Sequence, residues 1–274
     1  MNFSVLISIY HKEKACNLRD CLQSVFSQTV PPQEVVLVKD GSLNNELDSE
    51  IQRQKDAHPE LTVVALAENR GLGIALNEGM KHCHHDIVAR MDADDICLLD
   101  RYEKQLAFLE AHPETDVVGA WISEFIESPE NIVSIRNLPE HHQDIYRFGK
   151  SRNPINHPVV MFRKKAVMAV GGYQHMPLFE DYYLWARMLK KGYRFHNLQE
   201  PLLLFRRSSE MILRRGGIEY ARHEMVFQKA IYRLGYISSA RMIANVAMRF
   251  GIRIVPNWLR SLIYSHFLRR LIRE

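Results

Sequence analysis

One stretch of the chain decides the fold: Ile87-Val88-Ala89-Arg90-Met91-Asp92-Ala93-Asp94-Asp95. It opens with a short, nearly continuous apolar run, which is typical of a strand buried on both faces in an α/β sheet. Three carboxylates follow within four residues, and they repel one another. A hard divalent cation, which prefers oxygen ligands, would offset that repulsion. A solvated acidic turn at the start of the next helix is the alternative interpretation of the same residues.

The composition indicates a globular protein with reduced cysteines. Its 274 residues allow one large domain, or one domain with an appendage. The four cysteines form no CxxC pair, which favours free thiols and a cytoplasmic location. The first residues lack the basic segment of a signal peptide, and no stretch approaches the ~20 apolar residues of a membrane span.

Strand-like and helix-like segments alternate along residues 1–115. β-rich apolar runs predict strands, and amphipathic stretches predict the helices between them. The expected strands are 3–9, 35–38, 62–66 and 86–91, and the expected helices are 17–28, 47–58, 74–82 and 102–111. Such alternation predicts βαβ units in a mainly parallel sheet, where ligands bind beyond the carboxyl ends of the strands. His11, Asp40 and the acids at 92–95 all follow such ends.

The pattern changes near residue 116. Strand-like runs and one helix opened by acids predict a mixed second half, in which 132–136 pairs antiparallel to a neighbour. The expected strands are 117–122, 132–136, 156–162, 193–196 and 202–205, and the expected helix is 180–191. Beyond residue 206 the chain becomes helical and basic. Residues 241–274 hold seven arginines, no lysine and one acid, which argues for a localised contact with an anionic surface.

Five landmarks, in this order, resemble the family 2 glycosyltransferases with a GT-A fold. They are the strand Ser4–Tyr10; Lys39-Asp40-Gly41-Ser42, similar to the family's DDGS with Lys39 in place of the first acid; Asn69-Arg70-Gly71 followed by Ala75, Asn77 and Gly79; the DxD motif Asp92-Ala93-Asp94-Asp95 followed by Asp100-Arg101; and Glu180-Asp181 with Leu184-Trp185, similar to the ED motif.

The resemblance implies an α/β, GT-A fold with a catalytic domain in residues 1–206. A Rossmann-like, mainly parallel nucleotide-sugar-binding half would occupy residues 1–115, and a mixed acceptor half residues 116–206. Residues 207–274 would form a basic, amphipathic helical arm.

On the donor side, the resemblance implies a metal and a nucleotide site. Asp94, with Asp92, would hold Mn²⁺ or Mg²⁺, whose charge neutralises a diphosphate leaving group. Asp95 would support them. The nucleotide of a UDP-sugar would contact Ser8, Tyr10, Asp40, Arg70 and Asp92. Packing at a strand end is the alternative role for Ser8 and Tyr10, and Arg70 could be only a loop cation.

On the acceptor side, Asp181 matches the family's catalytic base. It would deprotonate the acceptor hydroxyl in an inverting transfer, with Glu180 as the alternative base. A helix N-terminus stabilised by acids is the non-catalytic interpretation of this pair. His157 resembles a position near the acceptor. The histidine tracts 82–85 and 141–142 have no partner cluster in the sequence and are interpreted as solvated helix ends.

Residues 263–273 place apolar and aromatic side chains on one side of a helix and arginines on the other. Such a helix suits an anionic membrane surface. Packing on the catalytic domain, or on a second subunit in a homo-oligomer, is the alternative. The arginines are not part of a nucleic-acid-binding motif, so no nucleic-acid partner is expected.

The chain lacks the QxxRW motif and the membrane spans of processive family members, so one sugar is expected per encounter. The resemblance implies transfer of a hexose (glucose, galactose or GlcNAc) from a UDP-sugar to a polyprenyl-diphosphate-linked saccharide. The setting would be O-antigen, lipopolysaccharide or capsule synthesis, at the inner face of the cell membrane. A nucleotidyltransferase is one alternative, although its Gly-rich loop is missing after the first strand. A membrane-attached scaffold that binds nucleotide sugars without turnover is the other.

Overall fold

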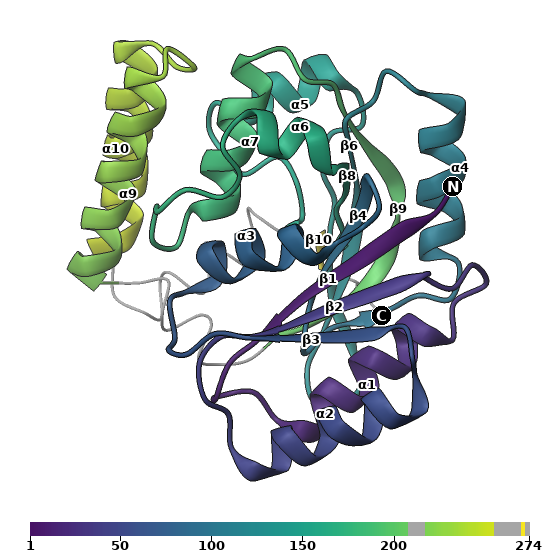
Figure 1. Ribbon diagram of the computed structural model, residues 1–274. Coiled ribbons are helices and arrows are strands. Elements are labelled where there is room, and N and C mark those ends of the chain that lie inside the picture. The colour runs from purple at the N-terminus through teal and green to yellow at the C-terminus, as the bar shows by residue number, and fades with distance from the viewer. Residues whose placement is uncertain (208–216, 255–269, 272–274) are drawn as a thin grey trace.

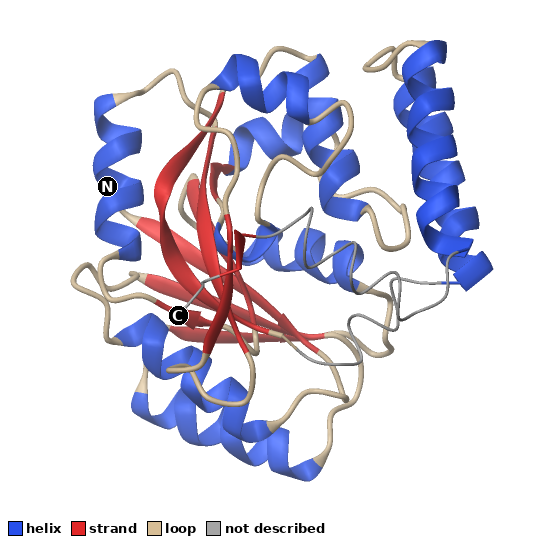
Figure 2. Ribbon diagram, turned by 180° about the vertical axis from the view of Figure 1, so that it is seen from behind, coloured by secondary structure: helices blue, strands red, loops and turns tan. Residues whose placement is uncertain are grey.

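The computed structural model describes residues 1–207, 217–254 and 270–271. A curved, mixed sheet forms the centre, and helices cover both of its faces (Figures 1 and 2). The first part of the chain forms β1 (Phe3–Ile9), α1 (Ala15–Phe26), β2 (Glu34–Lys39), α2 (Asn45–Ala57), β3 (Leu61–Ala65), α3 (Leu72–His82), β4 (Ile87–Asp92), β5 (Ile96–Cys97) and α4 (Arg101–Ala111). The second part forms β6 (Val117–Phe125), β7 (Ile132–Arg136), α5 (His142–Phe148), the 3₁₀ turn η1 (His157–Val159), β8 (Met161–Arg163), α6 (Lys164–Ala169), α7 (Glu180–Lys190), β9 (Phe195–Arg206), α9 (Gly217–Arg233), α10 (Ser239–Ile254) and β10 (Arg270–Leu271).

The strand order is β10-β7-β6-β8-β4-β1-β2-β3, with β9 beside β6 and β5 beside β9. Strands β1, β2, β3 and β4 run parallel, while β8 is antiparallel to both β4 and β6. The βαβ units predicted for the first half are therefore present. The short β8 joins them to the mixed second half.

Alternate residues of the central strands face two different cores. Odd-numbered side chains, such as Val5 and Ile7 of β1, pack against α1, α2 and α4. Even-numbered side chains, such as Leu6 of β1 and Val38 of β2, pack against α3 and α7. This follows from the twofold alternation of a strand, and both faces of the parallel part are therefore apolar.

Every element predicted before residue 115 is present, with ends shifted by at most two residues. The prediction was less accurate in the second half. Two expected strands, 193–196 and 202–205, are one continuous strand, β9. Pro201 lies opposite Trp121 of β6, and the register shifts on both sides of that pair. A local irregularity of this kind lets a strand accommodate a proline that cannot donate to the ladder.

The expected strand 156–162 was also wrong in its first half. Residues 157–159 form the 3₁₀ turn η1, and only residues from Met161 onwards join the sheet as β8. The short helices α5 and α6 were not expected from the sequence. Both are only two turns long or less, too short for a clear helical periodicity.

The C-terminal region begins as part of the main core. Phe227 of α9 stacks on Phe179, just before α7, with ring centroids 4.9 Å apart, and it contacts Tyr182 of α7 at 4.5 Å. Helix α10 lies beside α9 (Figure 1). Within the described residues, no helix combines the length and apolar character needed to cross a bilayer.

Most of the helix expected across 263–273 lies outside the described residues. At residues 270–271 the expectation was wrong, because these residues form the strand β10, paired with Ser134 and Ile135 of β7. An edge strand such as β7 presents unpaired backbone N–H and C=O groups, and a further strand satisfies them.

A glycine at the end of β2 gives a testable prediction for the fold. Gly41 has φ +85°, and a Cβ there would lie 2.6 Å from the backbone nitrogen of Asn69. Gly192 has φ +88° with open space around it. We expect Gly192→Ala to lose only the cost of the left-handed backbone, about 1–3 kcal/mol of unfolding free energy. Gly41→Ala should lose a further 1–3 kcal/mol, about the cost of overpacking.

Urea unfolding of the two variants measures this difference. Equal destabilisation by the two substitutions would show that the contact between the β2 end and the loop at Asn69 is not tight.

Candidate active site

The carboxyl ends of three parallel strands meet at one edge of the sheet. Ser8 of β1 pairs with Val38 of β2 on one side and with Asp92 of β4 on the other. The backbone N–H of Asp40 donates to the carbonyl oxygen of Ile9 at 2.8 Å. Ser8, Asp40 and Asp92 share the even-numbered parity that faces α3 and α7. The sheet therefore presents these three predicted side chains together.

Arg90 is a cation inside the sheet. It is 1% exposed, and both terminal guanidinium nitrogens donate to the carboxylate of Asp92, Nη1 at 2.9 Å and Nη2 more closely. Two residues apart in a strand, Arg90 and Asp92 share one face. The buried charge is therefore compensated by a paired carboxylate in a two-pronged geometry.

Asp94 and Asp95 carry strongly perturbed carboxyls. Burial, with the charges of Asp92 and Glu13, raises the pKa of Asp94 to about 7. Burial and the charges of Asp94 and Asp92 also raise the pKa of Asp95 well above its usual value. One oxygen of Asp95 accepts from the backbone N–H of Arg206 at 2.9 Å. The other has no hydrogen-bond partner among the described residues.

This turn fits a divalent cation. Asp92, Asp94 and Asp95 supply only oxygen donors, and burial together with their mutual repulsion raises the pKa values of Asp94 and Asp95. A hard cation prefers such donors and would lower those pKa values by its charge. Arg206 closes the turn from β9, since its Nε donates to the carbonyl oxygen of Asp94 at 2.9 Å.

Asp40 holds the loop that begins α3. Its two carboxylate oxygens accept from the backbone N–H groups of Arg70, at 2.7 Å, and of Gly71, at 3.0 Å. The side chain of Arg70 is exposed. Lys39 has the opposite parity, and its Nζ forms an ion pair with Asp48 of α2 at 2.5 Å. The lysine that departs from the family motif therefore lies away from the acidic edge.

The other two residues predicted to contact the nucleotide are partly exposed to solvent. Ser8 and Tyr10 are half-buried at the end of β1. The ring of Tyr10 meets that of His11 edge to face, with centroids 5.6 Å apart.

Asp181 lies in the first turn of α7, on the same face of the sheet. Burial raises the pKa of its carboxyl, and the Nδ2 of Asn153, which donates to it at 2.6 Å, and the charge of Arg90 oppose that rise. Burial and the charge of Asp181 raise the pKa of Glu180, which packs close to Gly73 of α3. Arg90 binds Asp92, and its charge also affects the pKa of Asp181. The DxD motif and the ED motif therefore lie close to the same cation.

Tyr173 occupies the same region. Its hydroxyl is 2.8 Å from Nε2 of His157, and Asn77 of α3 bonds both its backbone N–H and its carbonyl oxygen, at 2.8 and 2.6 Å. Burial raises the pKa of Tyr173, and the charges of Asp181 and Asp92 add to that rise. Burial and Arg90 lower the pKa of His157 well below its usual value. His157 is thus a neutral, buried partner of Tyr173.

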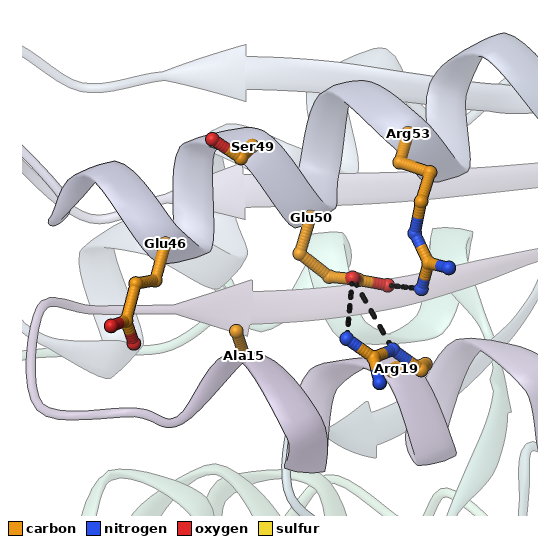
Figure 3. Close-up of a pocket in the computed structure, with 6 residues that line it drawn as sticks. All are labelled: Ala15, Arg19, Glu46, Ser49, Glu50 and Arg53. Atoms are coloured by element: carbon orange, nitrogen blue, oxygen red, sulfur yellow. Dashed lines mark hydrogen bonds and ion pairs between the residues drawn. The ribbon is translucent and has the colours of Figure 1, made fainter.

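One cavity, of about 440 Å³, lies elsewhere, between α1 and α2 (Figure 3). Figure 3 shows Glu50 between Arg19 and Arg53, whose guanidinium groups both bind its carboxylate. The carboxylate of Glu50 is thus fully engaged, and Glu46 lines the same cavity. None of the residues predicted for the site lines this cavity.

Comparison with known proteins agrees with this geometry. Residues 4–171 match the family model described as glycosyl transferase family 2. The chain belongs to glycosyl transferase family 2.

Two curated relatives match nearly end to end. An Escherichia coli protein named UDP-Gal:alpha-D-GlcNAc-diphosphoundecaprenol beta-1,3-galactosyltransferase is 38% identical over 270 residues, covering 98% of each chain. The amylovoran biosynthesis glycosyltransferase AmsE of Erwinia amylovora is 39% identical over 263 residues, covering 96% of this chain and 98% of the relative.

Among solved structures, the mannosyltransferase PcManGT from Pyrobaculum calidifontis, in complex with GDP-Man and Mn²⁺, superposes with a TM-score of 0.65 at 19% identity. The match covers 96% of this chain and 73% of the other. It confirms the predicted α/β, GT-A fold.

Four residues of this family 2 glycosyltransferase were not expected at the site: Arg90, Asn153, Tyr173 and Arg206. Arg90 had a detectable signal, because a charged residue interrupts an apolar strand two positions before the DxD motif. The others reach the site from distant parts of the chain, and no local pattern indicates them. The four cysteines are free, as predicted. The tract 82–85 ends α3, with His82 and His84 exposed as expected.

Asp95 gives a prediction for stability. Its pKa is raised in the folded state, whereas an unfolded Asp titrates near about 3.9. Between the two pKa values, the folded state keeps a proton that the unfolded state has lost. The contribution of Asp95 to stability is therefore greatest below the unfolded pKa and falls as the pH rises towards the folded one. We expect Asp95→Asn, which keeps the shape without the charge, to be more stable than the wild type at pH 8 in EDTA.

Chemical unfolding at pH 4 and pH 8 measures this effect. The variant and the wild type should converge at the lower pH, and Asp56→Asn, on the exposed side of α2, should change stability at neither. A wild type that gains stability over Asp95→Asn between pH 4 and pH 8 would contradict the prediction.

Proposed function

We propose that this glycosyltransferase transfers one hexose, with inversion, from a UDP-sugar to a polyprenyl-diphosphate-linked saccharide during synthesis of O-antigen, lipopolysaccharide or capsule. The two near full-length relatives support this proposal, because their names describe a galactosyl transfer to a lipid-linked GlcNAc and amylovoran synthesis. UDP-galactose with GlcNAc-diphosphoundecaprenol is accordingly the first donor and acceptor pair to test, before UDP-glucose and UDP-GlcNAc.

The observation that carries the proposal is the convergence on Arg90. Its guanidinium group binds Asp92 of the DxD motif and also opposes the rise that burial causes in the pKa of Asp181 of the ED motif. Tyr173 responds to the charges of the same two acids. The leaving-group side and the base side of a transfer reaction would therefore be close enough to act on one substrate.

On the donor side, Asp94 is the first candidate to hold Mn²⁺ or Mg²⁺, because both oxygens of Asp92 already accept from Arg90. Such a cation would neutralise the charge that develops on the diphosphate leaving group. Asp92 would hold the metal together with Asp94, or bind the ribose. Ser8, Tyr10 and Asp40 would meet the nucleotide. The exposed side chain of Arg70 is free to turn towards the phosphates.

On the acceptor side, Asp181 would accept the proton of the acceptor hydroxyl as that oxygen attacks the anomeric carbon. The bond from that carbon to the diphosphate breaks on the opposite side, which inverts the configuration. Asn153 would hold the carboxylate in place and favour its ionised form. His157 would act through Tyr173, which it contacts at 2.8 Å.

We further propose that the exposed face of α9 binds an anionic membrane, so that the enzyme works as a peripheral protein on its cytoplasmic side. Apart from the exposed acid Glu219 at its edge, this face presents apolar and basic side chains at helical spacing: Ile218, Arg222, Met225, Val226, Lys229, Tyr232 and Arg233. Ile218 is 72% exposed and Val226 57%. A lipid-linked acceptor would lie in that surface, and basic residues are attracted to anionic lipids.

A scaffold that binds nucleotide sugars without turnover is the second candidate. Such a scaffold would need the residues that bind the nucleotide sugar, but not the carboxylate of Asp181 or the amide of Asn153 that holds it. A nucleotidyltransferase has less support, since the loop after β1 reads Tyr10-His11-Lys12-Glu13-Lys14, without glycine. Neither alternative accounts for a partly buried carboxylate held by an amide opposite the DxD motif.

The catalytic proposal predicts that Asp181→Asn lowers kcat by about 10²–10⁴, the usual contribution of a general base. UDP binding should remain, because the donor side is unchanged. Release of UDP from UDP-galactose with GlcNAc-diphosphoundecaprenol and Mn²⁺ measures turnover, and calorimetry measures UDP binding. Glu180→Gln is the matched control and should retain most of the activity.

The pH profile tests the same role. Burial raises the pKa of Asp181, so kcat/KM should fall on the acid side at a pH above the value of about 3.9 for a free Asp. Asn153→Ala removes a bond to the ionised form and should move this fall to higher pH. Full activity of Asp181→Asn would show that Asp181 is not the base. If the wild type turned over no donor with any acceptor, the catalytic proposal would be rejected.

The membrane proposal predicts that replacing Arg222, Lys229 and Arg233 with alanine weakens binding to phosphatidylglycerol vesicles. The loss should be on the order of 100-fold, at about 1 kcal/mol for each cation near the surface. Vesicle co-sedimentation measures it, with the exposed cations Lys55, Arg147 and Lys165 replaced together as the control. A dimer in lipid-free solution that dissociates on Val226→Asp would instead assign this face to a second subunit.

A further inference from the structure

Three side chains of the types that bind metals meet at the end of the sheet opposite the acidic edge. Glu140 and His141 precede α5, and His196 is the second residue of β9. One ligand atom from each lies within 4.8 Å of the other two. The carboxylate of Glu140 is 3.8 Å from Nε2 of His141 and 3.9 Å from Nε2 of His196.

Backbone contacts hold this cluster in place. The N–H of Asn197, next to His196, donates to the carbonyl oxygen of Glu140 at 3.0 Å, and its Nδ2 donates to that of Pro139 at 2.7 Å. His141 is the N-cap of α5, and its carbonyl oxygen accepts from the N–H groups of residues 144 and 145. Both loops are therefore joined, with no metal needed to bring the residues together.

The ring of His196 is also oriented. It stacks on Phe108 of α4, with centroids 4.1 Å apart and planes 20° apart. Burial lowers the pKa of His196, and the charge of Glu140 opposes that change. Its side chain is 16% exposed, whereas that of His141 is 70% exposed and free to move towards an ion.

The donor set selects a different class of metal from the acidic edge. Two imidazoles and a carboxylate suit Zn²⁺ and neighbouring transition metals, whereas Mg²⁺ and Mn²⁺ prefer oxygen donors. Zinc bonds of about 2.0–2.1 Å in a tetrahedron place ligand atoms roughly 3.4 Å apart. The separations of 3.8 and 3.9 Å from Glu140 go to its two different carboxylate oxygens, and a set with one ligand atom per residue spans up to 4.8 Å. Rotation of the exposed side chain of His141 and of Glu140 would have to bring these atoms together around an ion.

We propose that Glu140, His141 and His196 bind one Zn²⁺ ion, with a water molecule as the fourth ligand. The ion reinforces the hydrogen bonds that already join the loop before α5 to the start of β9. Its role is structural, because ten steps along β9, at ~3.3 Å each, separate His196 from Arg206 at the acidic turn.

Calorimetric titration of the untagged, full-length protein with Zn²⁺ tests the site. Excess Mg²⁺ in the buffer occupies the oxygen-only sites, and thermal unfolding with and without Zn²⁺ gives a second readout. We expect one Zn²⁺ per chain that depends on this cluster, and a higher unfolding midpoint in its presence. His141→Ala and His196→Ala should each weaken binding by about tenfold or more, the loss seen even for outer-sphere partners.

His82→Ala is the matched control, because His82 lies 3.8 Å from Glu78 in an exposed His–Glu pair, with no third metal-binding side chain nearby among the described residues. It should leave the Zn²⁺ affinity unchanged. His141 is on the surface, so its replacement leaves the fold intact and separates lost binding from lost folding. Zn²⁺ binding that is absent in the wild type, or that is unchanged in both His141→Ala and His196→Ala, overturns the proposal.

Discussion

The ion pair between Arg90 and Asp92 is the constraint on which the site depends. A guanidinium group inside a sheet is stable only if carboxylates compensate its charge, and removing one partner of a buried pair is strongly destabilising. Asp92 provides the direct partner, and the field of Arg90 favours ionisation of Asp181 as well. The acids of the two motifs are thus part of the electrostatic balance of the fold, in addition to their chemistry.

Strand parity explains why these groups share one face. Ser8, Asp40, Arg90 and Asp92 have the parity of Leu6, Val38 and Val88, whose side chains pack towards α3 and α7. Moving any of these strands by one residue would turn its polar end towards α1 and α2. Lys39 shows that outcome, since it lies one residue before Asp40 and pairs with α2 instead. The apolar core therefore sets the register that aligns the site.

The first half of the fold was predictable because its signals are local. Each strand there is an apolar run, and each ends at a polar residue or a turn, so alternation alone predicts the parallel sheet and its functional edge. The second half depends on long-range contacts. Nothing near Pro201 indicates that β6 has an irregularity opposite it, and nothing near Asn153 indicates Asp181 as its partner. His141 is exposed at the start of α5, as predicted, but no local pattern indicates that His196, far along the chain, lies beside it.

The packing of α9 on α7 has a consequence for the acceptor. Phe179, two residues before Asp181, stacks directly on the inner side of α9. If the outer side of α9 rests on lipid, only the thickness of one helix, about 10–12 Å, separates that contact from the bilayer. The proposed base would then lie about one helix diameter above the lipid, a height that would favour an acceptor with few sugars between the reacting hydroxyl and the lipid diphosphate.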